Sequence, residues 1–103
     1  MADDPGVSKN LVEQLQRMQE AVLKAQKELA QATVTETAGG GAVKVTLTGD
    51  QRCTELVIDP QSLAGGDAEM LQDLVMTAFN NALEASRKLA LDRLGPFSAG
   101  VGS

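Results

Sequence analysis

The chain has 103 residues, enough for one small domain, and a formal net charge of −5 at pH 7. Its lack of histidine and its single cysteine, Cys53, exclude histidine-based catalysis, an internal disulfide and a CxxC metal or redox site. Aromatic residues make up 2% of the chain, so the core has to be aliphatic, and the acidic balance argues against a protein that coats nucleic acid through bulk positive charge.

Residues 1–7 are predicted to be a disordered tail. The first ten residues contain Asp3, Asp4, Pro5 and Gly6 and lack an apolar core, so they are not a signal peptide. No apolar run is long enough to span a membrane. We therefore expect a cytoplasmic protein without a membrane partner. Nothing in the sequence indicates a cofactor, a bound metal or a small-molecule substrate.

A long helix is predicted over residues 8–32, with Ser8 as its N-cap. Its apolar residues recur at steps of four and three, which is close to the coiled-coil period. The resulting stripe consists of Leu11, Leu15, Met18, Val22, Ala25, Leu29 and Ala32. So narrow a stripe favours packing against another helix, from the same chain or from a partner.

An antiparallel meander of three strands is predicted over residues 33–37, 42–48 and 51–59. The Gly49-Asp50 dipeptide suits a two-residue turn, which would place Lys44 directly opposite Glu55. Alternate apolar residues then share one face of the sheet. These residues are Val43, Val45, Leu47, Leu56 and Ile58.

The second long helix is predicted over residues 67–94, with Asp67 as its N-cap and the Gly95-Pro96 dipeptide as its stop. A connector over residues 61–66 precedes it, with Leu63 expected to pack onto the core. Residues 95–103 are small and rich in glycine, and we predict a second disordered tail there.

Acidic residues gather where the second helix begins, and they raise the alternative of a carboxylate metalloenzyme. The residues concerned are Asp59, Asp67, Glu69 and Asp73. Without a histidine ligand, helix capping and the helix dipole explain them better than a metal site does. We therefore predict neither a metal site nor catalytic residues.

The two helices are longer than the sheet that they flank. At about 1.5 Å per residue they span on the order of 36 to 42 Å, whereas a strand of six or seven residues spans roughly 20 to 23 Å. Their uncovered apolar residues should pack against each other or against a second copy, which predicts a homodimer with projecting helical arms. The residues assigned to this interface or to the core are Leu11, Leu15, Met18, Val22, Val43, Val45, Leu47, Leu56, Ile58 and Phe79.

Basic residues lean towards the start of the first helix and the end of the second, which we expect to lie together away from the sheet. They are Lys9, Arg17, Arg87, Lys88 and Arg93. Neighbouring acidic residues offset part of this charge, and a solvated helix face is the simpler interpretation. In a dimer, however, two such clusters would be able to straddle a DNA duplex and contact its phosphates.

Three segments carry a more specific pattern: LVEQLQRMQEAVLKAQKELA at 11–30, GGGAVKVTLTGDQRCTELVIDP at 39–60 and DAEMLQDLVMTAFNNALEAS at 67–86. Together they resemble the YbaB/EbfC family of bacterial nucleoid-associated proteins. The resemblance implies an α+β fold in the order α-β-β-β-α, a tweezer-like homodimer, and binding of double-stranded DNA at the nucleoid. It also implies that the ends of the arms contact DNA, which here means the five basic residues named above.

One departure from the family concerns the start of the chain. Its usual members begin with a tail rich in Met, Gly and Lys, whereas this chain opens with Asp3 and Asp4. A weaker affinity for DNA, or a preference for a protein partner, would follow from that difference.

The predicted function is that of a nucleoid-associated protein, not an enzyme, which binds double-stranded DNA with little sequence specificity and modulates nucleoid organisation and gene expression. A second class of function stays open. The stripe of residues 8–32 would also suit a protein-interaction adaptor or dimerisation module that recruits a partner helix without binding DNA.

Overall fold

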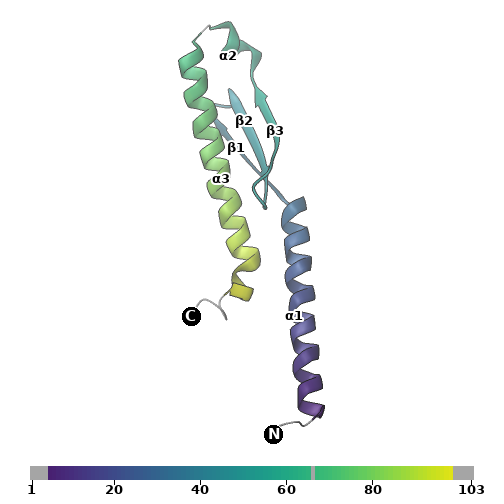
Figure 1. Cartoon of the computed structure of the whole chain (residues 1–103). Coiled ribbons are helices and arrows are strands. Elements are labelled where there is room, and N and C mark those ends of the chain that lie inside the picture. Colours follow the sequence, from purple (N-terminus) through teal and green to yellow (C-terminus); the bar gives the residue numbers. More distant parts are fainter. Residues whose placement is uncertain (1–4, 66, 99–103) are drawn as a thin grey trace.

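The computed structural model describes residues 5–65 and 67–98 and shows an elongated molecule of 75 × 24 × 16 Å (Figure 1). The strands form one antiparallel sheet in the order β1-β2-β3, which confirms the predicted α+β meander between two long helices. The elements are α1 (Pro5–Gln31), β1 (Thr33–Ala38), β2 (Val43–Thr48), β3 (Cys53–Ile58), α2 (Pro60–Ala64) and α3 (Ala68–Ser98).

Both long helices extend further than predicted. Helix α1 begins at Pro5 rather than Ser8, and proline is favoured at the first helical position because its missing N–H has no partner there anyway. Helix α3 continues through Gly95-Pro96 to Ser98, so the expected stop does not end it. A proline this close to a helix end removes one backbone hydrogen bond without abolishing the last turn.

These extensions reach into both of the tails that were predicted to be disordered. Residues 5–7 belong to α1 and residues 95–98 belong to α3. Residues 1–4 and 99–103, which make up the rest of the two tails, lie outside the described residues.

The connector before α3 contains an additional short helix, α2. The Asp59 carboxylate accepts a hydrogen bond from the Gln61 backbone N–H at 3.0 Å, and Pro60 occupies the first helical position. Leu63 is 59% exposed on this helix, so the expectation that it packs onto the core is wrong. Asp67 does cap α3 as predicted, accepting a hydrogen bond from the Met70 N–H at 3.0 Å.

The connection between β2 and β3 is a three-residue loop, not the predicted two-residue turn. The Thr48 N–H donates to the Arg52 carbonyl at 2.8 Å, and Gln51 adopts a left-handed conformation with φ 67°. A left-handed third residue is the usual way in which hairpin loops of this length close. This loop residue and the bulge after Thr46 shift the pairing by up to two residues.

The shifted register changes the partners that were predicted across the ladder. Val43 faces Ile58 and Val45 faces Leu56, whereas Lys44 lies opposite Val57 rather than Glu55. Lys44 still reaches Glu55 diagonally, with 3.5 Å between its Nζ and the Glu55 Oε1. The ion pair therefore forms, although it does not mark the register.

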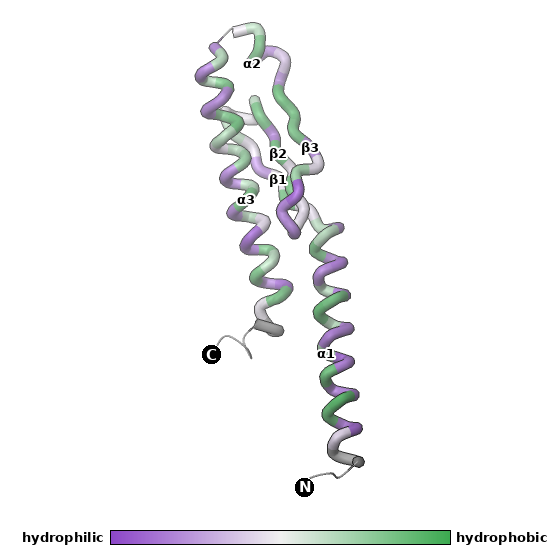
Figure 2. The backbone as a smooth tube through the Cα atoms, viewed as in Figure 1, coloured by the Kyte–Doolittle hydropathy of each residue, from purple (hydrophilic) through white to green (hydrophobic). Residues whose placement is uncertain are grey.

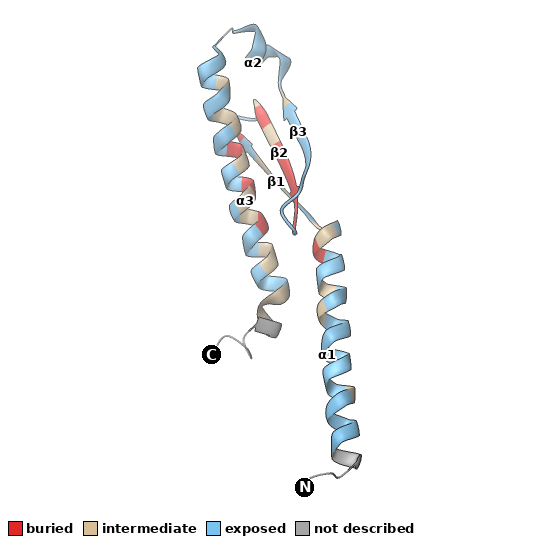
Figure 3. Ribbon diagram, viewed as in Figure 1, coloured by how far each residue is buried: buried red, intermediate tan, exposed pale blue. Residues whose placement is uncertain are grey.

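The core lies between one face of the sheet and α3. Val43, Val45 and Leu47 of β2 are fully buried against Ala78 and Ala82 of α3. Partly buried apolar residues complete the cluster: Val34, Ile58, Leu71, Leu74, Val75, Phe79 and Leu83. Figure 3 shows the buried strand β2 between two more exposed neighbours.

Strand β3 and most of α1 are left uncovered by the rest of the described chain. Helix α3 packs on β1 and β2, so Leu56 on the core face of β3 is 44% exposed. Among the described residues of α1, Leu29 alone is buried, while Val22 is half-buried. Figure 2 shows hydrophobic and hydrophilic residues interspersed along the coloured part of this helix. The residues of its stripe that remain more than half exposed are Leu11, Leu15 and Met18.

Candidate nucleic-acid interface

Two helical segments project beyond the same end of the sheet (Figure 1). Helix α3 covers the sheet up to Ser86, and its remaining residues 87–98 form what we call the α3 arm. Helix α1 projects over nearly its whole length and is called the α1 arm. At about 1.5 Å per residue, the α3 arm is about 18 Å long and the α1 arm about 40 Å.

This difference in length corrects the expectation that the two helix ends lie together. Arg93 on the α3 arm is paired with Glu28, near the sheet end of α1, with 3.8 Å between Nη1 and Oε2. Lys9 is about 28 Å further along α1 and Arg17 about 16 Å, at 1.5 Å per residue. The reason is that α3 starts at the far end of the sheet and uses most of its length to cover it.

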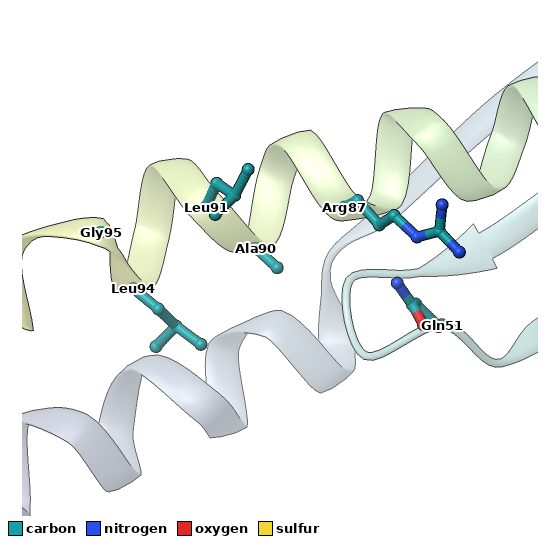
Figure 4. Close-up of a pocket in the computed structure, with 6 residues that line it drawn as sticks. All are labelled: Gln51, Arg87, Ala90, Leu91, Leu94 and Gly95. Carbon is teal, nitrogen blue, oxygen red and sulfur yellow. The ribbon is translucent and has the colours of Figure 1, made fainter. Parts of the chain in front are cut away.

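Arg87 stands at the base of the α3 arm, beside the loop between β2 and β3. In Figure 4 its guanidinium group and the side chain of Gln51 lie close together, and Leu94 points towards α1. An open groove of about 440 Å³ runs along this side of the arm. Its lining residues are Gln51, Arg87, Ala90, Leu91, Leu94 and Gly95.

Lys88 has a less favourable setting for binding a phosphate. It shares a shallow hollow of about 220 Å³ with Glu36 of β1 and Glu84 of α3. Two carboxylates near one ammonium group lower the local positive potential. Of the basic residues on the α3 arm, Arg87 and Arg93 are therefore better placed to meet a polyanion.

Lys9 and Arg17 occupy the part of the α1 arm that extends past the α3 arm. The Arg17 side chain is 75% exposed, and its only contact with charge in the described structure is to Glu13, one turn earlier, at 3.8 Å. Exposed pairs of this kind contribute about 0 to 1 kcal/mol and open readily. Arg17 is therefore free to exchange this partner for a phosphate.

Two basic residues of α1 were not selected from the sequence but belong to this region. Lys24 lies one turn before Glu28 on the same helix face, and Lys27 is adjacent to Glu28. Both are exposed and line a groove with Leu23. Because Glu28 contacts Arg93, these lysines lie level with the α3 arm. Both lysines are visible in the sequence. Their position beside the α3 arm could not be inferred, however, because the sequence was interpreted with two arms of equal length, which would place these lysines near the sheet.

The described residues offer neither a metal site nor a membrane-spanning helix. Over residues 5–65 and 67–98, no group of three or more cysteine, aspartate or glutamate side chains could hold a metal ion. Asp59 and Asp67 cap helices, which accounts for two of the four acidic residues noted in the sequence. No helix within the same residues is long and apolar enough to cross a membrane.

The fold defines a class of small α+β proteins in which two helices project beyond a three-stranded meander. A crystal structure of an uncharacterized protein from Helicobacter pylori has the same fold, with a TM-score of 0.68 and 27% identity. The match covers 76% of this chain and 82% of that one.

The model of the YbaB/EbfC DNA-binding family matches residues 5–101. A nucleoid-associated protein of Xanthomonas oryzae pv. oryzae is 47% identical over 91 residues, covering 88% of this chain and 84% of that protein. A nucleoid-associated protein of Nocardia farcinica is 46% identical over 90 residues, covering 87% and 82%. This chain therefore belongs to the YbaB/EbfC DNA-binding family, as the three sequence segments indicated.

Proposed function

We propose that this protein is a cytoplasmic, nucleoid-associated protein that binds double-stranded DNA through the helical arms of a homodimer. Family membership and the names of its bacterial relatives support a role at the nucleoid. The observation that carries the proposal is the pair of projecting arms with exposed arginine and lysine side chains in a chain of net charge −5. Through such binding it would modulate nucleoid organisation and gene expression.

Contacts to phosphates suit the arms better than contacts to base edges. The basic residues are spread along two smooth helices, and no segment of the chain matches a base-reading motif. Phosphate contacts position a protein on DNA without carrying sequence information, so specificity should be low. The proposed contact residues are Lys9, Arg17, Lys24, Lys27, Arg87, Lys88 and Arg93.

Pairing of two copies is supported by the apolar surface that one protomer leaves uncovered. Helix α1 and the open edge strand β3 both expose large apolar side chains, and soluble proteins rarely leave so many uncovered. A symmetric dimer would bury such surfaces against each other. The side chains concerned are Leu11, Val12, Leu15, Met18, Leu23, Leu56 and Val57.

A mobility-shift titration with random-sequence and defined duplexes, at several salt concentrations, tests the proposal. The double variant Arg87→Gln and Lys88→Gln should bind both duplexes more weakly. The slope of log affinity against log salt should become shallower by about 0.9 for each phosphate contact that is lost. Wild-type protein that fails to shift either duplex at low salt would contradict the proposed function.

The matched control makes the same change in net charge far from the arms. Gln61→Glu and Gln72→Glu together also lower the charge by two, but both residues are exposed at the opposite end of the molecule. DNA affinity should change little in this control. If both double variants lose the same affinity, net charge rather than arm contact would explain the binding.

The exposed stripe on α1 favours one second candidate, a protein-interaction adaptor that does not bind DNA. Leu11, Leu15 and Met18 are 54–57% exposed and would suit a partner helix. Purification with and without nuclease separates the two functions. An adaptor should keep its co-purifying proteins after nuclease treatment, whereas a DNA-binding protein should lose those held through DNA.

A further inference from the structure

The loop between β2 and β3 contacts the end of α1 so closely that only glycine fits there. The Gly49 N–H donates to the carbonyl groups of Leu29 and Ala32, both at 2.9 Å. A Cβ on Gly49 would lie 2.6 Å from the Leu29 Cδ2 and 2.8 Å from its carbonyl oxygen. The loop therefore satisfies carbonyl groups at the helix end, where they lack partners within the helix.

The same loop is also attached to α3, at the point where the α3 arm begins. The Ser86 hydroxyl donates to the Thr48 carbonyl at 2.8 Å. Ser86 is 0% exposed and Thr48 is 2% exposed, so water does not compete for this hydrogen bond. The Thr48 carbonyl also accepts from the Gln51 N–H at 2.9 Å, so removing the hydroxyl would break the connection of the loop to α3 while this bond within the loop remains.

Hydrogen bonds within the loop make it a firm connection between these two attachments. The Thr48 hydroxyl donates to the Asp50 carboxylate and accepts from the Arg52 backbone N–H at 3.0 Å. Thr48 Oγ1 thus holds both sides of the loop, while its carbonyl binds α3. The ion pair of Glu28 and Arg93 joins the two arms directly. Both side chains are about half exposed, so this pair contributes little to holding the arms in place.

We propose that the loop of residues 48–52 is a clamp that fixes the separation and direction of the α1 and α3 arms. Gly49 and Ser86 are then positioning residues for DNA binding, and neither touches DNA. The DNA-binding part of this inference rests on the proposed function. Arms held in one arrangement can engage several phosphates without first losing conformational freedom, so a loosened clamp should weaken binding.

The separation of the arms is measured directly by pulsed electron paramagnetic resonance on the full-length chain. Spin labels are attached at Gln19→Cys on α1 and Leu91→Cys on α3, both exposed positions, after Cys53→Ser removes the native thiol. Mixing with a large excess of unlabelled protein restricts the measurement to distances within one protomer. The test variants are Ser86→Ala and Gly49→Ala.

Two control variants make the same substitutions where no clamp contact exists. Gly65 has φ −71°, and the nearest atom to an added Cβ is 3.8 Å away, so Gly65→Ala introduces neither clash nor strain. Ser62→Ala removes a hydroxyl at the opposite end of the molecule, in α2. Both controls should keep the wild-type distance distribution and DNA affinity.

The clamp variants should broaden the distance distribution between the arms and lower duplex affinity by about threefold or more. A lower melting temperature with an unchanged distance distribution would reduce Ser86 to a structural role and overturn the proposal. A broadened distribution with unchanged DNA affinity would overturn the positioning role. If Gly49→Ala fails to fold, the Ser86→Ala variant alone tests the proposal, because this substitution adds no atoms.

The two proposals fail in different ways. If the wild-type protein does not bind duplex DNA, the proposed function fails and the positioning role fails with it. The distance distributions still decide whether the loop clamps the arms, because they are recorded without DNA. If the wild type binds DNA and the clamp variants match it in both measurements, the inference alone is wrong.

Discussion

At the scale of single residues, Glu28 occupies the position where DNA phosphates would compete for Arg93. Its carboxylate lies 3.8 Å from the Arg93 guanidinium, and the two side chains are 50% and 46% exposed. An ion pair with this exposure is screened by solvent and easily exchanged. Glu28 is therefore an internal competitor for one of the proposed phosphate contacts.

Glu28→Gln should strengthen duplex binding at low salt. The substitution releases Arg93 from a competing carboxylate, and an exposed pair of this kind contributes about 0 to 1 kcal/mol, equivalent to a gain of up to about fivefold. Titration of a duplex by fluorescence anisotropy measures the gain. Glu69→Gln is the control, since it removes the same charge from an exposed residue at the opposite end of the molecule, about 36 Å from Arg93 along α3. Equal gains in both variants would show that Arg93 is not involved specifically.

At the scale of elements, the stripe on α1 is the apolar surface that the rest of the described chain leaves most exposed. Its half nearer the N-terminus lies beyond the reach of the sheet and of the α3 arm, and Leu15 there is 54% exposed. Burying that half in a dimer would remove apolar surface from water at about 25 cal/mol per Å². The stripe and the exposed strand β3 together are the surfaces through which we propose that two copies pair.

Leu15→Glu should shift the protein from dimer towards monomer. A carboxylate placed in an apolar interface would be buried without a partner, and the dimer dissociation constant should rise by about tenfold or more. Sedimentation equilibrium over a range of protein concentrations gives that constant. Gln16→Glu adds the same charge at the next residue, outside the stripe, and should leave the constant unchanged. A dimer unaffected by Leu15→Glu would exclude the stripe as its interface.

The elements also show how far the sequence could predict this fold. The hydrophobic periodicity was sufficient to predict the order of helices and strands. In a strand, for example, alternate residues such as Val43, Val45 and Leu47 face the same side. The register was not predictable, since it depends on Gln51 adopting a left-handed conformation that glutamine seldom takes. Helix α2 was not predicted: residues 61–66 were expected to be a connector, although Asp59-Pro60 matches the pattern of a cap followed by a first-position proline.

Less of the candidate site was predictable, because it depends on how far each helix extends past the sheet. Composition and spacing identified basic residues near the helix ends, Arg87 and Arg93 among them. Where α3 stops covering the sheet is decided by packing, with Ser86 as the last buried residue before the arm. The pairing of Arg93 with Glu28, and the nearby position of Lys24, follow from that packing and not from a local pattern.

At the scale of the whole molecule, charge is distributed unevenly between the two ends. Between Arg52 and Arg87 the chain has no basic residue, and this segment includes the end of the sheet that lies away from the arms. The acidic residues of the segment are Glu55, Asp59, Asp67, Glu69, Asp73 and Glu84. The electric field of the protein should therefore orient the arms towards DNA and the opposite end away from it.

If the arms face DNA, a positive charge added to an arm should strengthen DNA binding more than one added at the opposite end of the molecule. Gln16→Lys, on the α1 arm, should strengthen duplex binding and steepen the slope of log affinity against log salt by about 0.9 for each new phosphate contact. Gln72→Lys should change affinity less than about twofold at physiological salt. It lies about 22 Å from Arg87 along α3, at 1.5 Å per residue, which exceeds twice the screening length of about 8 Å. Mobility-shift titrations of both variants make the comparison, and equal effects at the two positions would mean that DNA does not approach from the arm end.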